Sequence, residues 1–152
     1  MLTRTLPTPF GTLRLTEDNN AITRVTWGTA PAEDASALLD QAAEELAAYA
    51  DGRLHTFSVP LHVNGSQFQR DVCDAMRAIP FGDTCTYGDI AKALNAPAQA
   101  VGQACGANPI PVIIPCHRVM GSGGRLTGFS GQGGVETKVA LLKHEGAGSF
   151  LL

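Results

Sequence analysis

The hydrophobic pattern changes its period at Asn64-Gly65, and this change constrains the fold more than any other feature of the chain. Before it, TLRLT alternates after a Pro-Phe-Gly turn and ITRVTW is rich in β-branched residues, so both segments are expected to be strands. After it, the apolar residues recur at helical spacing, in short segments separated by Pro and Gly. We therefore expect two small domains, residues 1–64 and 65–152, in an α/β fold.

The first segment has two further expected elements. Between Ser36 and Ala50 the apolar residues fall at helical spacing, and Gly52 is a plausible stop. FSVPL contains a proline, which cannot donate to a ladder, so it is expected to be an edge strand. Strands followed by a helix and another strand indicate a mixed α/β domain.

The second segment carries four expected helices. Ser66 with Gln69 forms the signature of a capping box, and Thr86 with Asp89 forms another. The expected helices run from Ser66 to Pro80, from Thr86 to Leu94, from Pro97 to about Cys105, and from about Gly134 to Glu145 with Val135, Val139 and Leu142 on one face. The break at 95–97 between the second and third helices is typical of a helix-turn-helix.

Charge and cysteine spacing exclude several classes of protein. The formal net charge is −3, but residues 67–152 carry seven Lys and Arg against six acids, so any DNA-binding surface is expected on the second segment. The four cysteines have no Cys-x-x-Cys spacing, so neither a metal site nor a disulfide framework is expected. No apolar run is long enough to span a membrane, and we expect a cytoplasmic protein.

The stretch VIIPCHRVM, residues 112–120, combines a cysteine and a histidine behind a β-branched apolar run, residues 112–114, which is expected to be a buried extended segment. Cys116 can be a buried small hydrophobe, a metal ligand or a nucleophile. In an extended segment its side chain and that of His117 point to opposite faces, so His117 would act on the thiol only through a water. Glu145 is one candidate for the carboxylate that orients His117. Arg118 is read either as a DNA contact or as a buried ion pair that holds the turn.

A family resemblance is carried by Asn108-Pro109, the string Pro-Cys-His-Arg-Val at 115–119, Gly-Phe-Ser-Gly at 128–131, Lys138 and His-Glu-Gly at 144–146. These motifs resemble the O6-alkylguanine-DNA alkyltransferases, also called methylated-DNA–protein-cysteine methyltransferases. The resemblance implies a ribonuclease-H-like N-terminal domain and a winged helix-turn-helix-like C-terminal domain. It also implies a monomer without cofactor or metal that binds double-stranded DNA through the minor groove, with single strands as a further substrate.

The resemblance also implies the reaction, in which a flipped O6-alkylguanine, or O4-alkylthymine, gives its alkyl group irreversibly to Cys116. His117 resembles the water-mediated base, Glu145 its orienting residue, Asn108 the brace of the turn and Tyr87 the hydrogen-bond donor to the departing base. The residues implied to contact DNA or substrate are Thr86, Ala98, Gln99, Ala100, Gly102, Cys105, Val119, Phe129 and Ser130.

Two positions depart from the family pattern. Gln99 stands where an arginine usually fills the gap left by the flipped base, so duplex binding and flipping should be weaker. Phe129 stands where many members have tyrosine. The first departure keeps an alternative open, a DNA-lesion-binding relative that repairs weakly or not at all, although such relatives lack the acceptor cysteine. A cysteine hydrolase is the other alternative, and the adjacency of Cys116 and His117 argues against it.

Overall fold

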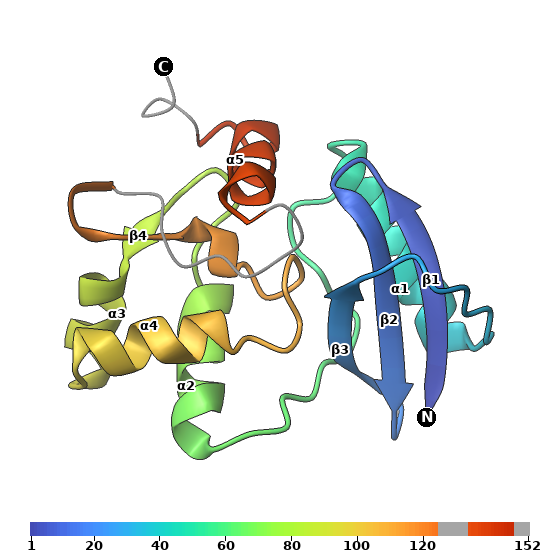
Figure 1. Ribbon diagram of the computed structural model, residues 1–152, viewed down its shortest axis with the longest axis horizontal. Helices are drawn as coiled ribbons and strands as arrows, with labels where there is room; N and C mark the ends of the chain where they lie inside the picture. Colours follow the sequence, from blue (N-terminus) through green and yellow to red (C-terminus); the bar gives the residue numbers. More distant parts are fainter. Residues whose placement is uncertain (125–133, 148–152) are drawn as a thin grey trace. The chain divides into compact units, whose positions relative to one another are not determined.

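The structure is a computed structural model that describes residues 1–124 and 134–147. The chain divides into two compact units, Met1–Asn64 and Gly65–Leu152 (Figure 1). Each unit has its own secondary structure and its own buried residues, so the two are described one after the other.

The first unit is a three-stranded antiparallel sheet with one helix packed on it. Strands β1 (Leu2–Thr8), β2 (Gly11–Asp18) and β3 (Ala21–Trp27) follow one another in the order β1-β2-β3. Helix α1 (Ala37–Ala50) covers one face of this sheet (Figure 1). The sheet and helix bury a common apolar core, formed by Leu13, Leu15, Ile22, Val25, Leu39, Leu46 and Tyr49.

Two features of this unit differ from expectation. Strand β1 was not predicted, because its apolar residues do not alternate clearly and Pro7 interrupts them. FSVPL is not a strand; its last residue makes only an isolated bridge between Leu61 and Ile22. The physical reason is that the backbone N–H groups of Ser58 and Val59 donate to the Glu45 carboxylate, at 2.9 and 3.0 Å, and so are not offered to a neighbouring strand.

The second unit is mainly helical. Helices α2 (Gln67–Arg77), α3 (Tyr87–Leu94) and α4 (Ala98–Gly106) pack against one another, and α5 (Val135–His144) packs on the 3-10 turn η1 (Cys116–Arg118). A short parallel pair, β4 (Cys85–Thr86) and β5 (Val119–Met120), ties the start of α3 to the residues after η1. A further 3-10 turn, η2, spans Ser122–Gly124.

The helix starts follow the sequence signals closely. Thr86 and Asp89 form the complete capping box, each side chain accepting from the backbone N–H of the other. Ser66 caps α2 as expected, but the Gln69 amide does not complete a capping box; it donates to the carbonyl of Ala104 at 2.8 Å and so links α2 to α4. Asn95, in the left-handed conformation, ends α3 as expected.

The buried face of α5 differs from the expected one. Lys138, Leu141 and Leu142 are the buried residues of this helix, whereas Val135 is 43% exposed. The amphipathic pattern was read from apolar residues alone, and it therefore excluded the lysine. Among the described residues, no helix is long and apolar enough to cross a membrane.

Candidate active site

The backbone that leads into Cys116 is a tight turn and not the extended run expected for residues 112–114. Val112 has a φ of 72°, a left-handed conformation that is strained for a β-branched residue. The Ile114 N–H closes the turn onto the Ile110 carbonyl at 2.9 Å. Asn108 braces the turn, because its amide donates to the Ile114 carbonyl at 2.9 Å and accepts from the Ile110 N–H at 3.0 Å.

Cys116 begins the 3-10 turn η1, so its conformation is also not extended. A 3-10 helix has three residues per turn, so neighbouring side chains are separated by about 120° around the axis. The side chains of Cys116 and His117 therefore still diverge, although for a reason other than the predicted one. Cys116 is partly exposed, whereas His117 is fully buried.

Glu145, at the end of α5, contacts both residues that follow Cys116. Its carboxylate lies 2.7 Å from Nε2 of His117 and accepts from Nε and Nη2 of Arg118 at 2.8 and 3.0 Å. Arg118 also donates to the Ile79 carbonyl at 2.7 Å and lies over the ring of Phe81. Of the two interpretations of Arg118, the buried ion pair is confirmed.

The contact with Glu145 fixes the tautomer of His117. An ionised carboxylate only accepts hydrogen bonds, so Nε2 must carry the proton and Nδ1 must present a lone pair. Nδ1 is buried and has no hydrogen-bond partner among residues 1–124 and 134–147. A buried basic nitrogen without a partner is costly, and its place beside a cysteine makes it a candidate base.

Burial controls the protonation of both groups. It lowers the pKa of His117, an effect that the hydrogen bond from Nε2 to the Glu145 carboxylate opposes, so the imidazole is neutral near pH 7. Burial raises the pKa of the Cys116 thiol to about 11, although the hydrogen bond with Asn108 and the charge of Lys138 lower it. At neutral pH Cys116 is therefore a thiol, and it needs a base to become the nucleophilic thiolate.

Lys138 is a buried cation that the sequence analysis gave no role. Its side chain has no exposed surface, and its ammonium donates to the Val119 carbonyl at 2.6 Å. It is within electrostatic range of Cys116 and Cys105. Its separation from Glu145 by two helical turns was the available signal, because residues seven apart on a helix share a face.

The other predicted residues in the described part of the chain lie at the start of α3 and on α4. Tyr87 is the first residue of α3 and half-buried, and Thr86 before it is occupied in capping. On α4, Ala98 and Gln99 are exposed, while Cys105 is buried, with its pKa raised to about 12 by burial. Ala100 and Gly102 are half-buried on the same helix. Phe129 and Ser130 lie outside the described residues.

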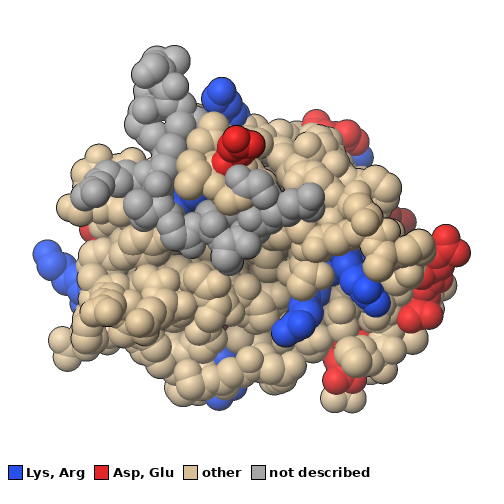
Figure 2. Space-filling model, in the orientation of Figure 1, with Lys and Arg blue, Asp and Glu red and all other residues tan. Residues whose placement is uncertain are grey.

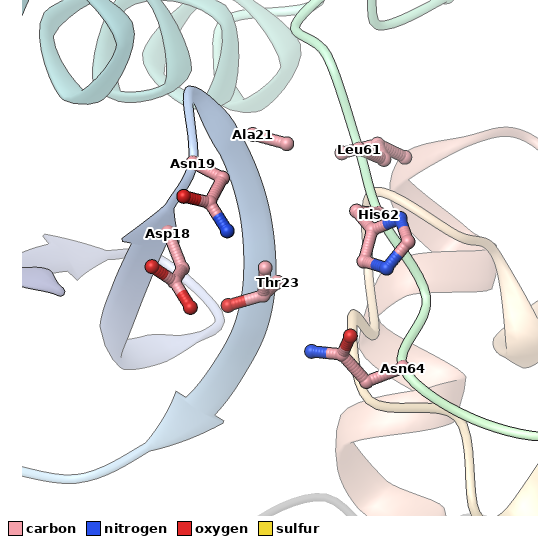
Figure 3. Close-up of a pocket in the computed structure, with 7 residues that line it drawn as sticks. All are labelled: Asp18, Asn19, Ala21, Thr23, Leu61, His62 and Asn64. Atoms are coloured by element: carbon pink, nitrogen blue, oxygen red, sulfur yellow. The ribbon is translucent and has the colours of Figure 1, made fainter.

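The first unit contains a separate polar cavity of about 330 Å³, remote from this chemistry in the sequence. Figure 3 shows the side chains of Asp18, Asn19 and Thr23, from the β2–β3 hairpin, facing the segment that carries His62 and Asn64. None of the predicted site residues lines it. In the described ranges, no group of three His, Cys, Asp or Glu residues is arranged to hold a metal ion.

The distribution of charged side chains on the surface agrees with the small excess of cations over acids in residues 67–152. On the described part of the face drawn in Figure 2, the Lys and Arg side chains lie in small groups separated by uncharged surface. Two of the seven cations in the second segment, Arg118 and Lys138, are buried in the site. Few cations are therefore left to contact phosphates.

The sequence from Gln67, the first residue of α2, to Ala147 matches a known family. Residues 67–147 match the model described as 6-O-methylguanine DNA methyltransferase, DNA binding domain, which is more than half of the chain. This range includes the cysteine turn, the histidine–glutamate contact and the buried lysine. The chain belongs to this family.

Individual relatives and solved structures define the type of protein within this family: the chain is similar to methylated-DNA–protein-cysteine methyltransferases. A protein of that name from Mycolicibacterium paratuberculosis is 42% identical over 88% of this chain and 78% of its own length, and one from Methanosarcina acetivorans is 46% identical over 70% and 69%. The crystal structure of the Mycobacterium tuberculosis O6-methylguanine methyltransferase matches with a TM-score of 0.85 at 39% identity, covering 96% of this chain and 93% of that one. The structure of the tuberculosis protein in complex with DNA also matches, with a TM-score of 0.85 at 38% identity over 97% and 94%.

Proposed function

We propose that this protein repairs DNA by direct reversal, taking an alkyl group, typically methyl, from O6-alkylguanine onto Cys116. The observation that supports it most is that Nδ1 of His117 has no hydrogen-bond partner within the described part of the chain, because the Glu145 contact leaves this buried nitrogen as a base on the residue after the cysteine. The family of the chain supplies the matching substrate class. O4-alkylthymine is a second substrate within the same proposal.

The reaction needs no cofactor. A water between the thiol and Nδ1 of His117 passes the Cys116 proton to the imidazole, and Glu145 stabilises the resulting imidazolium. The thiolate sulfur then attacks the alkyl carbon, so an S–C bond forms and the C–O6 bond breaks. The electron pair leaves with the guanine, which takes up a proton. Because the product is a thioether, Cys116 is used once and the protein is consumed.

Other residues have supporting roles in this proposal. Tyr87 donates a hydrogen bond to the departing guanine, Asn108 holds the turn, and the Val119 carbonyl accepts from the exocyclic amine of the base. Cys105 forms part of the pocket wall. Phe129 and Ser130, which lie outside the described residues, are proposed to contact the substrate.

The proposal for DNA binding concerns α3 and α4. We infer that they form the helix-turn-helix of a winged-helix-like domain, with Thr86, Ala98, Gln99, Ala100 and Gly102 against the minor groove of double-stranded DNA. The lesion is flipped out of the stack to reach Cys116, since its alkyl group is inaccessible inside a duplex. The first unit is proposed to have a ribonuclease-H-like fold, and the protein to act as a cytoplasmic monomer.

The test uses an oligonucleotide that carries O6-methylguanine. The protein is expected to gain the mass of one methylene per molecule, with the change located at Cys116 by fragmentation and absent in Cys116→Ala. Fragmentation is necessary because the tryptic peptide from Ala93 to Arg118 also contains Cys105. The matched control is Cys105→Ala, which should still be methylated.

An unchanged mass together with retained binding to the modified strand would favour the lesion-binding alternative. Modification at Cys105 in place of Cys116 would overturn the assignment of the acceptor.

A further inference from the structure

The polar cavity of the first unit is a part of the molecule that the proposed repair reaction does not use. Its volume of about 330 Å³ lies in the range of small-molecule sites. One wall is the β2–β3 hairpin, and the other is the segment of residues 61–64 (Figure 3). The lining consists of five polar residues, Asp18, Asn19, Thr23, His62 and Asn64, and two apolar ones, Ala21 and Leu61.

Backbone contacts hold both walls of the cavity in place. Asn19 and Asn20 form the turn of the hairpin with φ values of 50° and 61°, the left-handed conformation that a two-residue turn of type I′ requires. The second wall is joined to β3, because the Ile22 N–H donates to the Pro60 carbonyl at 2.9 Å and the His62 N–H donates to the Ile22 carbonyl at 3.0 Å. The fold therefore forms the cavity before a ligand arrives, and a preformed site pays less ordering entropy on binding.

The polar side chains of the cavity take no part in the hydrogen bonds that hold this unit together. In the part of the chain that the structure describes, none of the five makes a hydrogen bond or an ion pair with another residue. Other polar side chains of the unit are used in this way: Glu45 accepts from the N–H groups of Ser58 and Val59, and Arg4 pairs with Asp40. Figure 3 shows side chains from both walls pointing toward the space between them. Polar groups that converge on one cavity without protein partners are the arrangement expected of a binding site.

The chemistry of the lining limits the class of ligand. With histidine counted as neutral, Asp18 carries the single formal charge of the lining, and no described Lys or Arg lines the cavity, so an anion such as phosphate is repelled. Protein sites for metal ions combine several carboxylate, imidazole or thiolate ligands, and no group of three such residues exists among the described residues. The side-chain oxygens of Asn19, Thr23 and Asn64 accept hydrogen bonds. These groups suit a small organic cation that carries several N–H donors.

We propose that this cavity is a second binding site of the protein, and that it takes a small organic cation with an amine or guanidinium group. The Asp18 carboxylate pairs with the cationic group. The side-chain oxygens of Asn19, Thr23 and Asn64 accept from the remaining N–H groups of the ligand. Because Cys116 does not line the cavity, binding of this ligand is independent of alkyl transfer.

The test is a calorimetric titration of the whole chain with agmatine, without DNA. Agmatine carries a guanidinium and an amine, and saturable binding with a dissociation constant of about 1 mM or lower is expected. The matched ligand is 4-guanidinobutyrate, in which a carboxylate replaces the amine end. Since Asp18 repels this carboxylate, 4-guanidinobutyrate should bind weaker than agmatine by about tenfold or more.

Three variants locate the site. Asp18→Asn keeps the shape of the side chain and removes its charge, so it should weaken agmatine binding by about tenfold or more. Glu44→Gln makes the same change of charge at an exposed residue of α1 outside the cavity, and it should bind agmatine like the natural protein. Cys116→Ala should also bind agmatine like the natural protein.

Three results of the titration would overturn the proposal: no saturable binding of agmatine, equal affinities for the two ligands, or equal effects of Asp18→Asn and Glu44→Gln. If Asp18→Asn does not fold, NMR of the natural protein replaces it. Agmatine should then shift the amide signals of Asn19, Thr23 and Asn64, and shifts confined to other residues contradict the site.

Cys116→Ala separates this proposal from the repair function, because this variant cannot accept a methyl group. Binding of agmatine by Cys116→Ala supports the second site whether or not the natural protein takes up methyl from O6-methylguanine. Loss of agmatine binding in Cys116→Ala would place the ligand at the acceptor cysteine and refute the second site, while methyl transfer to the natural protein would still support repair.

Discussion

Glu145 is the residue on which the two basic side chains after Cys116 depend. It fixes the tautomer of His117 through Nε2 and balances the guanidinium of Arg118. Removal of one partner from a buried ion pair costs more than the pair contributes, because the remaining charge stays desolvated. A single carboxylate therefore links the chemistry of the site to the stability of its turn.

Substitution of Glu145 by Gln should separate these two effects. The shape is kept, but the imidazolium is no longer stabilised, and methyl transfer to Cys116 should slow by about 10²-fold. The free energy of unfolding should fall by about 3–5 kcal/mol, since Arg118 loses its counter-ion. Single-turnover kinetics measure the rate of methyl transfer, and urea denaturation measures the free energy of unfolding. Glu136→Gln, on the exposed side of the same helix, serves as the control and should change neither quantity appreciably.

The pKa of His117 predicts a pH dependence of stability. Because burial depresses it in the folded state, the neutral imidazole contributes stability that is present above the unfolded pKa of about 6.5 and is lost as the pH falls below it. The free energy of unfolding should fall as the pH is lowered through the window just below 6.5, by no more than about 1.4 kcal/mol per pH unit. Urea denaturation at several pH values measures this slope.

His117→Gln should flatten that slope, whereas His62→Gln should keep it, because His62 is exposed. Glu45 and Asp89 also have lowered pKa values, but carboxylates titrate below this window. Equal slopes in the natural protein and His117→Gln would show that another group is responsible.

The role of a residue was predictable where the residue belongs to a sequence motif or stands at a characteristic spacing from one. The Pro-Cys-His-Arg-Val string pointed to Cys116 and His117, and Glu145 was identified as a candidate carboxylate before its 2.7 Å contact was known. Lys138 was named as part of the family motif, but its burial was not predicted, because a lysine in an amphipathic pattern is normally placed on the solvent side. Its burial is accompanied by a tertiary contact, the hydrogen bond to the Val119 carbonyl.

At the scale of elements, local signals predicted the helices better than the irregular segments. Caps at Ser66 and Thr86 are encoded within one turn of sequence, and the structure confirms both. The segments at 57–61 and 112–114 were wrongly expected to be extended. Their conformations depend on side-chain contacts that span more than one turn of sequence: with the Glu45 carboxylate, 13 residues before Ser58, in the first case, and with the Asn108 amide, 6 residues before Ile114, in the second.

The turn between α3 and α4 gives a prediction at this scale. Asn95 ends α3 with a φ of 54°, where asparagine and glycine are tolerated and other residues are strained by about 1–2 kcal/mol. Asn95→Ala should therefore lower the free energy of unfolding by about 1 kcal/mol or more, as measured by urea denaturation. Asn95→Gly is the matched variant and should be close to the natural protein. Equal losses in both would mean that the Asn side chain, and not the backbone conformation, stabilises the turn.

Over the whole molecule, charge limits how the protein can hold DNA. The net charge is −3, and two of the seven cations in the second segment are buried in the site. Each phosphate contact contributes about 0.9 to the slope of log K against log salt concentration, so few exposed cations imply a shallow slope. Under the proposed base-flipping mechanism, binding then depends more on shape and on the flipped base, and the residue proposed to fill the gap in the stack becomes more important.

Gln99 on α4 tests this dependence, because it is exposed and stands where the family usually has arginine. Gln99→Arg adds a charge and a planar group that stacks on bases, so it should bind duplex DNA more tightly and steepen the salt slope by about one unit. It should also speed methyl transfer from duplex relative to single-stranded substrate. Gln103→Arg, one turn further along the helix and also exposed, supplies the same charge without a wedge; it should steepen the slope and leave the duplex-to-single-strand ratio unchanged. If Gln99→Arg improves neither duplex binding nor methyl transfer, Gln99 already fills the gap adequately. If both variants raise the duplex-to-single-strand ratio of methyl transfer equally, charge and not intercalation limits repair of duplex DNA.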